Sequence, residues 1–236
     1  MQLRRDLLGR ALLAEAPPAA HAWLVEARRR LAQASDATAE LQRLSASAGR
    51  ALGAASLTDT LRIPTAAGDV AVNQLTLADA ARLTLILETL ERTPRGAATW
   101  LHDYFRAGDD GEQIALVRGL ALLRDDAGLK PIAAEAGRSN SVALFRALAL
   151  DNPYPGAYYG VREFNQLVLK ALFLEQPLAR MAGLAERTNR ELSRMCEDYV
   201  EEREAAGRSV PDDIWLALLP HASARGREMA QRYAVG

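Results

Sequence analysis

The stretch DNPYPGAYYGVREFNQLVLKALFLEQPLARMAGLAERTN, residues 151–189, brings together aromatic residues, prolines and a long apolar segment. Pro153 and Pro155 disfavour regular helix, so they predict an extended turn. From about Tyr158 to Leu174 the chain is mostly apolar, which predicts a buried helix. Because nowhere else in the chain do aromatic residues, prolines and an almost all-apolar helix lie so close together, we expect this stretch to be the functional centre of the protein.

A polar stripe interrupts that apolar helix. Glu163, Gln166 and Lys170 recur at i, i+3 and i+7, so they share one narrow face. Of the 29 lysines and arginines in the chain, only Lys130 and Lys170 are lysines. Lys170 either snorkels or pairs with Glu163 on a solvated face, or it lines a pocket where its ammonium meets an anionic or phenolic ligand. The candidate binding residues are Asn152, Tyr154, Tyr158, Tyr159, Asn165, Gln166, Lys170 and Arg180.

The same stretch also has purely structural interpretations. Tyrosines and prolines often wedge a turn between helices against the core, with the phenol tip in water. Arg180, Arg187 and Asn189 either rim the pocket or satisfy carbonyl groups at the ends of neighbouring short helices. The residues alone leave both interpretations open.

Composition favours an all-α protein. The 236 residues are 49% hydrophobic but only 6% aromatic, and they are rich in Ala and Leu, which favours helix over strand. A formal charge of -1 gives no general attraction to nucleic acid. Asp6, Arg10 and Glu15 interrupt the N-terminal leucines, and no apolar run is long enough to span a bilayer. We therefore expect a cytoplasmic protein that does not span the membrane.

The order of helical and non-helical segments predicts an irregular α-solenoid (HEAT-like) or layered antiparallel helices, within one domain, 1–236. Residues 1–53 form an N-terminal helical layer with helices at 3–15, 18–34 and 36–52. Residues 54–75 form a long loop or, near 54–73, a small hairpin, because Pro64 and Gly68 predict a turn there. Residues 76–236 form stacked helices. Capping boxes are expected at Thr76, in T-x-x-D, and at Thr188, in T-x-x-E.

No catalytic or metal-binding constellation stands out. The histidines, His21, His102 and His221, lie far apart in the sequence and none has metal-ligand spacing to another ligand. The one cysteine, Cys196, falls on an apolar helical stripe and is interpreted as a buried hydrophobe. We assign no catalytic residue, metal or cofactor.

Several strings in the chain resemble the EboA family. They are NPYP at 152–155, FNQLVLKALFLEQPLARMAGLAERTNRELSRMCEDYV at 164–200, EEREAAGRSVPDDIW at 201–215 and LADAARLTLIL at 77–87. The resemblance is specific from Asn152 to about Trp215, the family-like core at 151–215, and covers roughly the C-terminal two-thirds of the chain.

The resemblance implies a part in metabolite traffic. Such proteins are grouped with a UbiA-like integral membrane protein and with metal-dependent hydrolase or isomerase relatives, and are implicated in moving a secondary metabolite or its precursor towards the periplasm. It therefore implies partners from the same traffic system, the UbiA-like membrane protein among them, and a small apolar or aromatic metabolite. It brings no catalytic residues with it.

Two functions follow as hypotheses. The first is a non-enzymatic cytoplasmic adaptor or carrier in metabolite traffic or export, which reaches the inner membrane only through a partner. The alternative is an enzyme acting on an isoprenoid or aromatic precursor, with Lys170 and a tyrosine in a helical pocket. The enzyme would require Lys170 and Tyr154 or Tyr158 to converge in a closed apolar cavity.

Overall fold

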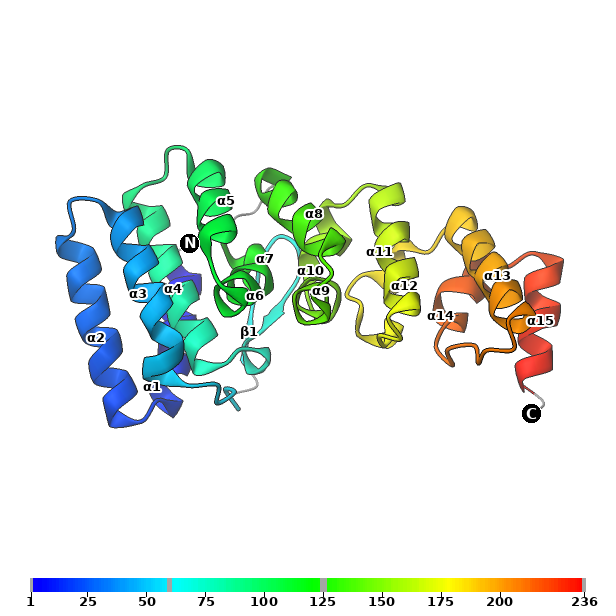
Figure 1. Cartoon of the computed structure of the whole chain (residues 1–236), viewed down its shortest axis with the longest axis horizontal. Coiled ribbons are helices and arrows are strands. Elements are labelled where there is room, and N and C mark those ends of the chain that lie inside the picture. Colours follow the sequence, from blue (N-terminus) through cyan, green and yellow to red (C-terminus); the bar gives the residue numbers. More distant parts are fainter. Residues whose placement is uncertain (1, 59–60, 124–126, 235–236) are drawn as a thin grey trace. The chain divides into compact units, whose positions relative to one another are not determined.

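The computed structural model describes residues 2–58, 61–123 and 127–234. Within these ranges the regular secondary structure is helical apart from one short hairpin and an isolated bridge between Ser56 and Thr76, which confirms the all-α class (Figure 1). By its internal contacts the chain divides into two compact units, Met1–Tyr154 and Pro155–Gly236. One domain over 1–236 stays a prediction, since two compact units can belong to one domain.

The first unit begins with the three predicted helices. They are α1 (Gln2–Glu15), α2 (Pro18–Gln33) and α3 (Ala37–Leu52). Pro18 occupies the first turn of α2, where a backbone N–H is not needed. Asp36 caps α3 by accepting hydrogen bonds from the backbone N–H groups of Thr38 and Ala39, both at 3.0 Å. The structure thus confirms these helices to within one or two residues.

The predicted small hairpin is also present. Strands β1 (Arg62–Ile63) and β2 (Val70–Ala71) are antiparallel, with Ile63 opposite Val70. Both of these side chains are buried, so the hairpin packs one face against the helices. Gly68 has φ 121°, a conformation that favours glycine, within the turn. Asp59 and Thr60, within the predicted loop or hairpin, lie outside the described residues.

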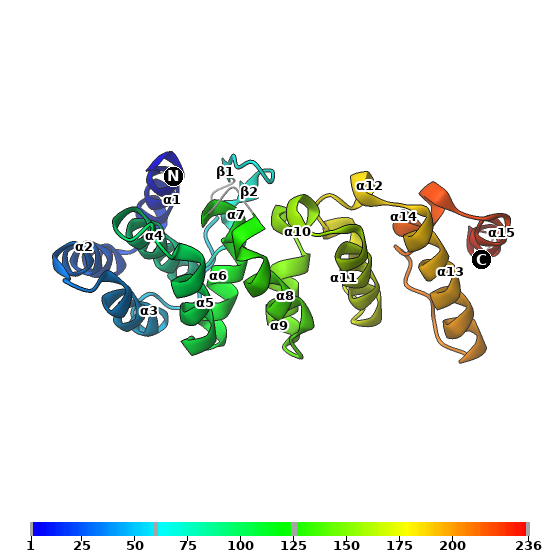
Figure 2. The same ribbon diagram turned by 90° about the horizontal axis from the view of Figure 1, so that it is seen from above.

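Helix α4 (Leu77–Arg92) forms the centre of the first unit. Its start is the predicted capping box, in which Thr76 and Asp79 each accept a hydrogen bond from the other's backbone N–H. Most of its side chains are buried, and it contacts α1, α2, α3 and the later helix α6 (Asp110–Arg118) (Figure 2). Because LADAARLTLILETLER is apolar on nearly every face, this segment is stable only when surrounded by other helices.

Shorter helices complete the first unit. They are α5 (Ala97–Ala107), α7 (Leu120–Leu123), α8 (Lys130–Arg138) and α9 (Val142–Ala149), with short 3-10 turns η1 (Val72–Gln74) and η2 (Ala127–Leu129). Gly119 separates α6 from α7 and lies directly against Leu83 of α4. The absence of a side chain at this position lets α6 approach α4 closely.

The extended turn predicted at Pro153 and Pro155 is wrong. These residues belong to a short helix, α10 (Pro153–Tyr158), and the boundary between the two units falls within it. The prolines lie in its first turn, where their missing N–H groups cost nothing. The side chain of Asn152 organises this start: its Oδ1 accepts from the backbone N–H of Tyr154 at 3.1 Å.

The second unit holds the remaining helices. They are α11 (Val161–Phe173), α12 (Leu184–Arg187), α13 (Arg190–Ala205), α14 (Trp215–Leu218) and α15 (Ala224–Ala234), with 3-10 turns η3 (Leu178–Arg180) and η4 (Leu219–His221). Within the described ranges, no helix combines the length and apolar character needed to cross a membrane.

Two local predictions in this unit need correction. The helix expected from Tyr158 begins only at Val161, because α10 ends at Tyr158 and Gly160 adopts an extended conformation. The capping box expected at Thr188 is absent, because the cap of α13 is Asn189, whose Oδ1 accepts from the N–H of Leu192 at 2.9 Å. An asparagine is at least as good a cap as a threonine, so the helix begins one residue later.

Candidate functional site

Helix α11 carries the predicted polar stripe, and both of its ends are capped by hydrogen bonds from residues of the same segment. The carboxylate of Glu163 accepts a hydrogen bond from the backbone N–H of Gly160 at 2.7 Å, so this residue serves as an N-terminal cap. At the other end Glu175 has φ 53°, and the N–H of Gln176 donates to the carbonyl of Ala171 at 2.8 Å. This is a Schellman motif, here built without glycine. Glu163 therefore caps the helix, whereas Gln166 and Lys170, on the same stripe, do not.

Helix α13 lies next to α11 and runs in the same direction (Figure 2). Near their starts, the side-chain amides of Asn165 and Asn189 exchange hydrogen bonds of 3.3 and 3.0 Å. Near their ends, the hydroxyl of Tyr199 donates to the carbonyl of Leu172 at 3.3 Å, and Arg203 and Glu175 pair at 3.5 Å. Since the starts meet each other and the ends meet each other, the two helices are parallel.

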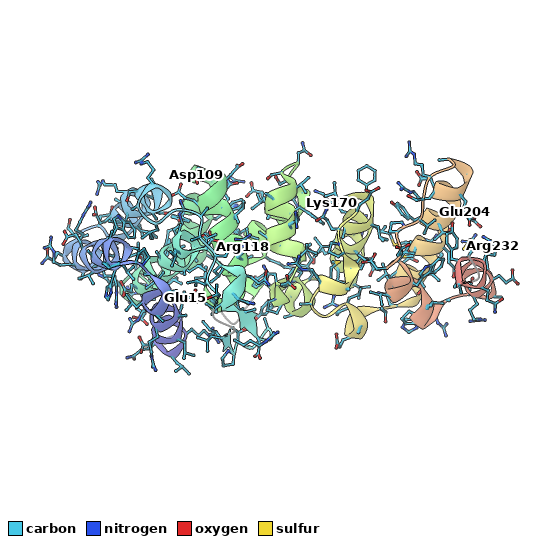
Figure 3. The ribbon with its side chains drawn as sticks, turned by 90° about the horizontal axis from the view of Figure 1, so that it is seen from below. Glu15, Asp109, Arg118, Lys170, Glu204 and Arg232 are labelled. Carbon is cyan, nitrogen blue, oxygen red and sulfur yellow. The ribbon has the colours of Figure 1, made fainter. Side chains whose placement is uncertain are left out.

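An open groove runs between these two helices, and we call it the α11–α13 groove. Helix α11 contributes Gln166, Leu169, Lys170 and Phe173. Helix α13 contributes Arg194, Met195, Asp198, Tyr199 and Glu202. Its volume is about 570 Å³, which lies within the range of ligand sites. Figure 3 marks Lys170 on α11.

An exposed aromatic side chain marks the C-terminal end of the groove. Phe173 is 73% exposed, more than any other large hydrophobic residue in the described ranges. Leu169, one turn earlier on the same face, and Met195 across the groove continue the apolar surface. An exposed apolar surface rimmed by polar groups is typical of a binding site.

The charged groups of the groove differ in how far they are satisfied. Arg194 bridges Glu191 at 2.9 Å and Asp198 at 2.7 Å, so it is held on its own helix. Partial burial lowers the pKa of the Lys170 ammonium from its ordinary value. Among the described residues, Glu202 has no side-chain ion pair. The groove therefore contains a partly desolvated ammonium, at Lys170, and a carboxylate, at Glu202, that forms no ion pair with another described residue.

Of the eight predicted binding residues, the groove brings together two, Gln166 and Lys170. Asn165 is buried and holds α11 against the cap of α13, so it positions the groove without lining it. Asn152 is buried in the first unit, where its amide nitrogen donates to the carbonyls of Val117 and Ala147. Tyr154 is fully buried there as well.

The remaining three predicted residues lie outside the groove lining. Tyr158 is half-buried, Tyr159 is buried, and Arg180 is exposed at the end of η3. Of the two interpretations of Arg187, the structure supports the one in which it binds carbonyl groups at the ends of short helices. Its guanidinium donates to the carbonyls of Gly156 and Tyr159 at 2.8 and 2.7 Å, and it stacks over Phe164.

Sequence reasoning missed most of the groove. Met195 and Tyr199 share the apolar stripe of α13 with Leu192 and Cys196, but they are half-buried, whereas Leu192 and Cys196 are fully buried. The apolar face of α13 is wider than packing against the core alone requires. This extra width was the sequence feature that could have pointed to the groove. The exposure of Phe173 depends on which elements pack against the end of α11, which the sequence does not reveal.

Other reactive groups give no competing site. Cys196 is buried as predicted, and burial raises the pKa of its thiol to about 12. His102 pairs with Glu135, Nε2 to Oε2 at 2.7 Å, and Arg106 binds the same carboxylate at 2.9 Å. Within the described part of the chain, no group of three or more His, Cys, Asp or Glu side chains has the arrangement of a metal site.

In a second groove, which lies in the first unit, the charged side chains are paired with one another. Arg28 pairs with Glu88 at 2.6 Å, and Arg5 pairs with Glu91, so its main charges are already satisfied. A third groove lies between α14 and α15, where the rings of Trp215 and Tyr233 are 5.3 Å apart. Neither groove contains any of the predicted binding residues.

The geometry that an enzyme would require is not found at Lys170. The α11–α13 groove is open, and neither Tyr154 nor Tyr158 lines it. A proton-transfer pair would need polar atoms within about 3 Å of each other around a substrate. What the groove can provide is contact: an apolar row, a cation and a carboxylate on two rigid helices.

The fold and the groove define an all-α protein whose candidate site is an open surface between two parallel helices. A family model described as "Metabolite traffic protein EboA" matches residues 4–219. Because the match spans most of the chain, including the N-terminal helices, the chain belongs to the EboA family. No curated protein and no solved structure matches the chain.

Proposed function

We propose that this protein is a non-enzymatic adaptor or carrier in metabolite traffic, acting through the α11–α13 groove. Membership of a family of metabolite traffic proteins supports the general role. The single observation that carries the proposal is the exposure of Phe173 at the mouth of a groove that also holds Lys170 and Glu202. Burial of such an aromatic side chain on contact would stabilise a complex.

The proposed partners are other proteins of the same traffic system, a UbiA-like membrane protein among them, or a small apolar or aromatic metabolite. The proposed place of action is the cytoplasm, at the inner membrane only through a partner. What supports a docking role is chemical: among its described residues the groove offers contact groups, and its acid–base pair is the Arg194–Asp198 ion pair held on α13 itself.

The proposal is tested by deleting the gene in a producing strain and measuring the pathway metabolite in cytoplasmic, membrane and external fractions. We expect the metabolite to accumulate in the cytoplasmic fraction, and wild-type chain supplied from a plasmid to restore its distribution. Purified tagged chain should also retain either a protein of the system or the metabolite, compared with a tag-only control. Unchanged distribution in the deletion strain, with nothing retained, would falsify the proposal.

A further inference from the structure

Helix α15 is attached to α13 mainly by ion pairs at the surface. Arg225 pairs with Asp198 at 2.9 Å and with Glu201 at 3.1 Å. Further along, Arg232 pairs with Glu204 at 3.1 Å, and Figure 3 marks both residues. Each of these side chains is at least 34% exposed. Ion pairs between exposed side chains are weak and are screened by salt, so they hold α15 in place without fixing it firmly.

Apolar burial adds little to this attachment. Of the residues of α15, only Gly226 and Met229 are buried. The ring of Tyr233 lies 5.3 Å from the ring of Trp215 but remains 40% exposed. A helix of 11 residues is marginal by itself in water, so α15 should unfold when it leaves α13. Opening of α15 should therefore cost much less than unfolding of the second unit.

The start of α15 is held in a different way. Glu197 of α13 is 3% exposed, and its carboxylate accepts hydrogen bonds from the backbone N–H and the hydroxyl of Ser223, at 2.9 and 2.8 Å. Gly226 lies directly against the same carboxylate. A buried carboxylate is costly to leave without its hydrogen bonds, and burial protects these bonds from salt. Glu197 and Ser223 therefore form a pivot for the helix.

Asp198 connects α15 to the α11–α13 groove. Its Oδ2 accepts from Arg194 of the same helix at 2.7 Å, and its Oδ1 accepts from Arg225 of α15 at 2.9 Å. Asp198 and Arg194 line the groove. With α15 in place, two guanidinium groups share this carboxylate, whereas Arg194 alone would remain after α15 has left. The α13 wall of the groove therefore becomes more negative when α15 opens.

We infer that α15 is a reversible strap, which pivots at Glu197 and Ser223 and opens when its ion pairs are screened. In the closed form Arg225 neutralises part of the charge of Asp198. In the open form Met229 is uncovered and the groove is more acidic. Neither the strap nor its effect on the groove depends on the proposed traffic role.

The first experiment measures opening with a thiol placed at the one buried side chain of α15. In Met229→Cys, iodoacetamide should label position 229 only when the strap is open, and the native Cys196 in the core of α13 serves as the control in the same molecule. Raising NaCl from about 20 mM to about 1 M, where the Debye length is about 3 Å, should speed labelling at 229 at least about tenfold and leave Cys196 unchanged.

Two results would overturn the strap: labelling at 229 that does not respond to salt, or acceleration of both thiols together, which would mean unfolding of more than α15. Hydrogen exchange of residues 224–234 in the wild-type chain, followed by mass spectrometry, gives the same comparison without a substitution. It keeps the inference testable if the cysteine variant folds poorly.

The second experiment removes the ion pairs one at a time in the Met229→Cys chain. Arg225→Ala and Arg232→Ala should each speed labelling at low salt and weaken its dependence on salt. Arg227→Ala is the matched control, because this arginine of α15 donates to the carbonyl of Ala222 at 2.8 Å and forms no ion pair with another described residue. An equal effect of Arg227→Ala would show that net charge, and not the ion pairs, holds α15, and would refute the strap.

The third experiment tests the effect on the groove. Leu169→Cys places a thiol in the groove lining, and the ratio of its labelling rates by anionic iodoacetate and neutral iodoacetamide reports the local charge. Arg225→Ala should lower this ratio at least about twofold, because Asp198 loses one of its two cations, whereas Arg227→Ala should leave it nearly unchanged. An unchanged ratio in the Arg225→Ala chain would overturn the link between the strap and the groove.

Discussion

Asn165 of α11 and Asn189, the residue that caps α13, exchange two side-chain hydrogen bonds of 3.3 and 3.0 Å. The same Oδ1 of Asn189 accepts from the N–H of Leu192 at 2.9 Å, so one side chain both begins α13 and holds it against α11. The position of α13 against α11, and with it the groove between them, therefore depends on this polar contact near the starts of both helices.

Asn165→Ala should destabilise the protein by about 1 to 3 kcal/mol, because it removes a buried side chain and both hydrogen bonds that join α11 to Asn189. Asn189 would keep its bonds to the carbonyl of Arg187 and the N–H of Leu192. The free energy of unfolding, from urea denaturation followed by circular dichroism, measures the effect. Gln166→Ala, on the exposed face next to it, should change stability by less than about 0.5 kcal/mol. Equal effects of the two substitutions would contradict the role given to the amide pair.

Lys170→Met removes the charge and keeps an apolar stem of similar length. Burial lowers the pKa of this ammonium, so the fold disfavours its charged form, and its removal should cost less than about 0.5 kcal/mol of stability. Metabolite traffic should nevertheless be lost in a strain that carries the variant at normal protein levels. Lys130→Met, at the only other lysine, is the matched control and should leave traffic unchanged. Normal traffic with Lys170→Met would remove this residue from the site.

Cys196 should be nearly unreactive in the folded protein. It is fully buried, and its thiol pKa of about 12 leaves little thiolate at pH 8. Labelling by iodoacetamide at that pH should be at least about a hundredfold slower in native protein than in urea-unfolded protein. Labelling at similar rates in both states would show that α13 is not packed as described.

Replacing glycine with alanine should have opposite effects on stability at two positions. A Cβ added at Gly119 would lie within 3.0 Å of three side-chain carbons of Leu83, which is fully buried, so Gly119→Ala should cost about 1 to 3 kcal/mol through overpacking. At Gly9, within α1, no atom lies within 4 Å of such a Cβ. Gly9→Ala should therefore stabilise by about 0.5 to 1 kcal/mol. Thermal unfolding of both variants compares them directly, and a tolerated Gly119→Ala would contradict the close packing of α6 on α4.

The sequence predicted local structure well wherever one residue type has one dominant effect. Thr76 and Asp79 predicted the start of α4, and Pro64 with Gly68 predicted the hairpin turn. It failed where two effects compete: the prolines of α10 are compatible with a helical first turn as well as with an extended one. Thr188 and Asn189 are both good caps, and only packing decided between them.

By itself, the sequence determined the all-α class, the bounds of the first three helices, the start of α4 and the resemblance to the EboA family, because propensity, capping and apolar periodicity act over a few residues. The tertiary structure alone decided which polar residues are available. It buried Asn152 and Tyr154, turned Asn165 into a support, and left Gln166 and Lys170 facing a groove with Phe173. The reason is physical: whether a side chain contacts the core or faces a groove depends on the neighbouring helix. Helix α13 lies beside α11 because the residues between them turn back along the chain.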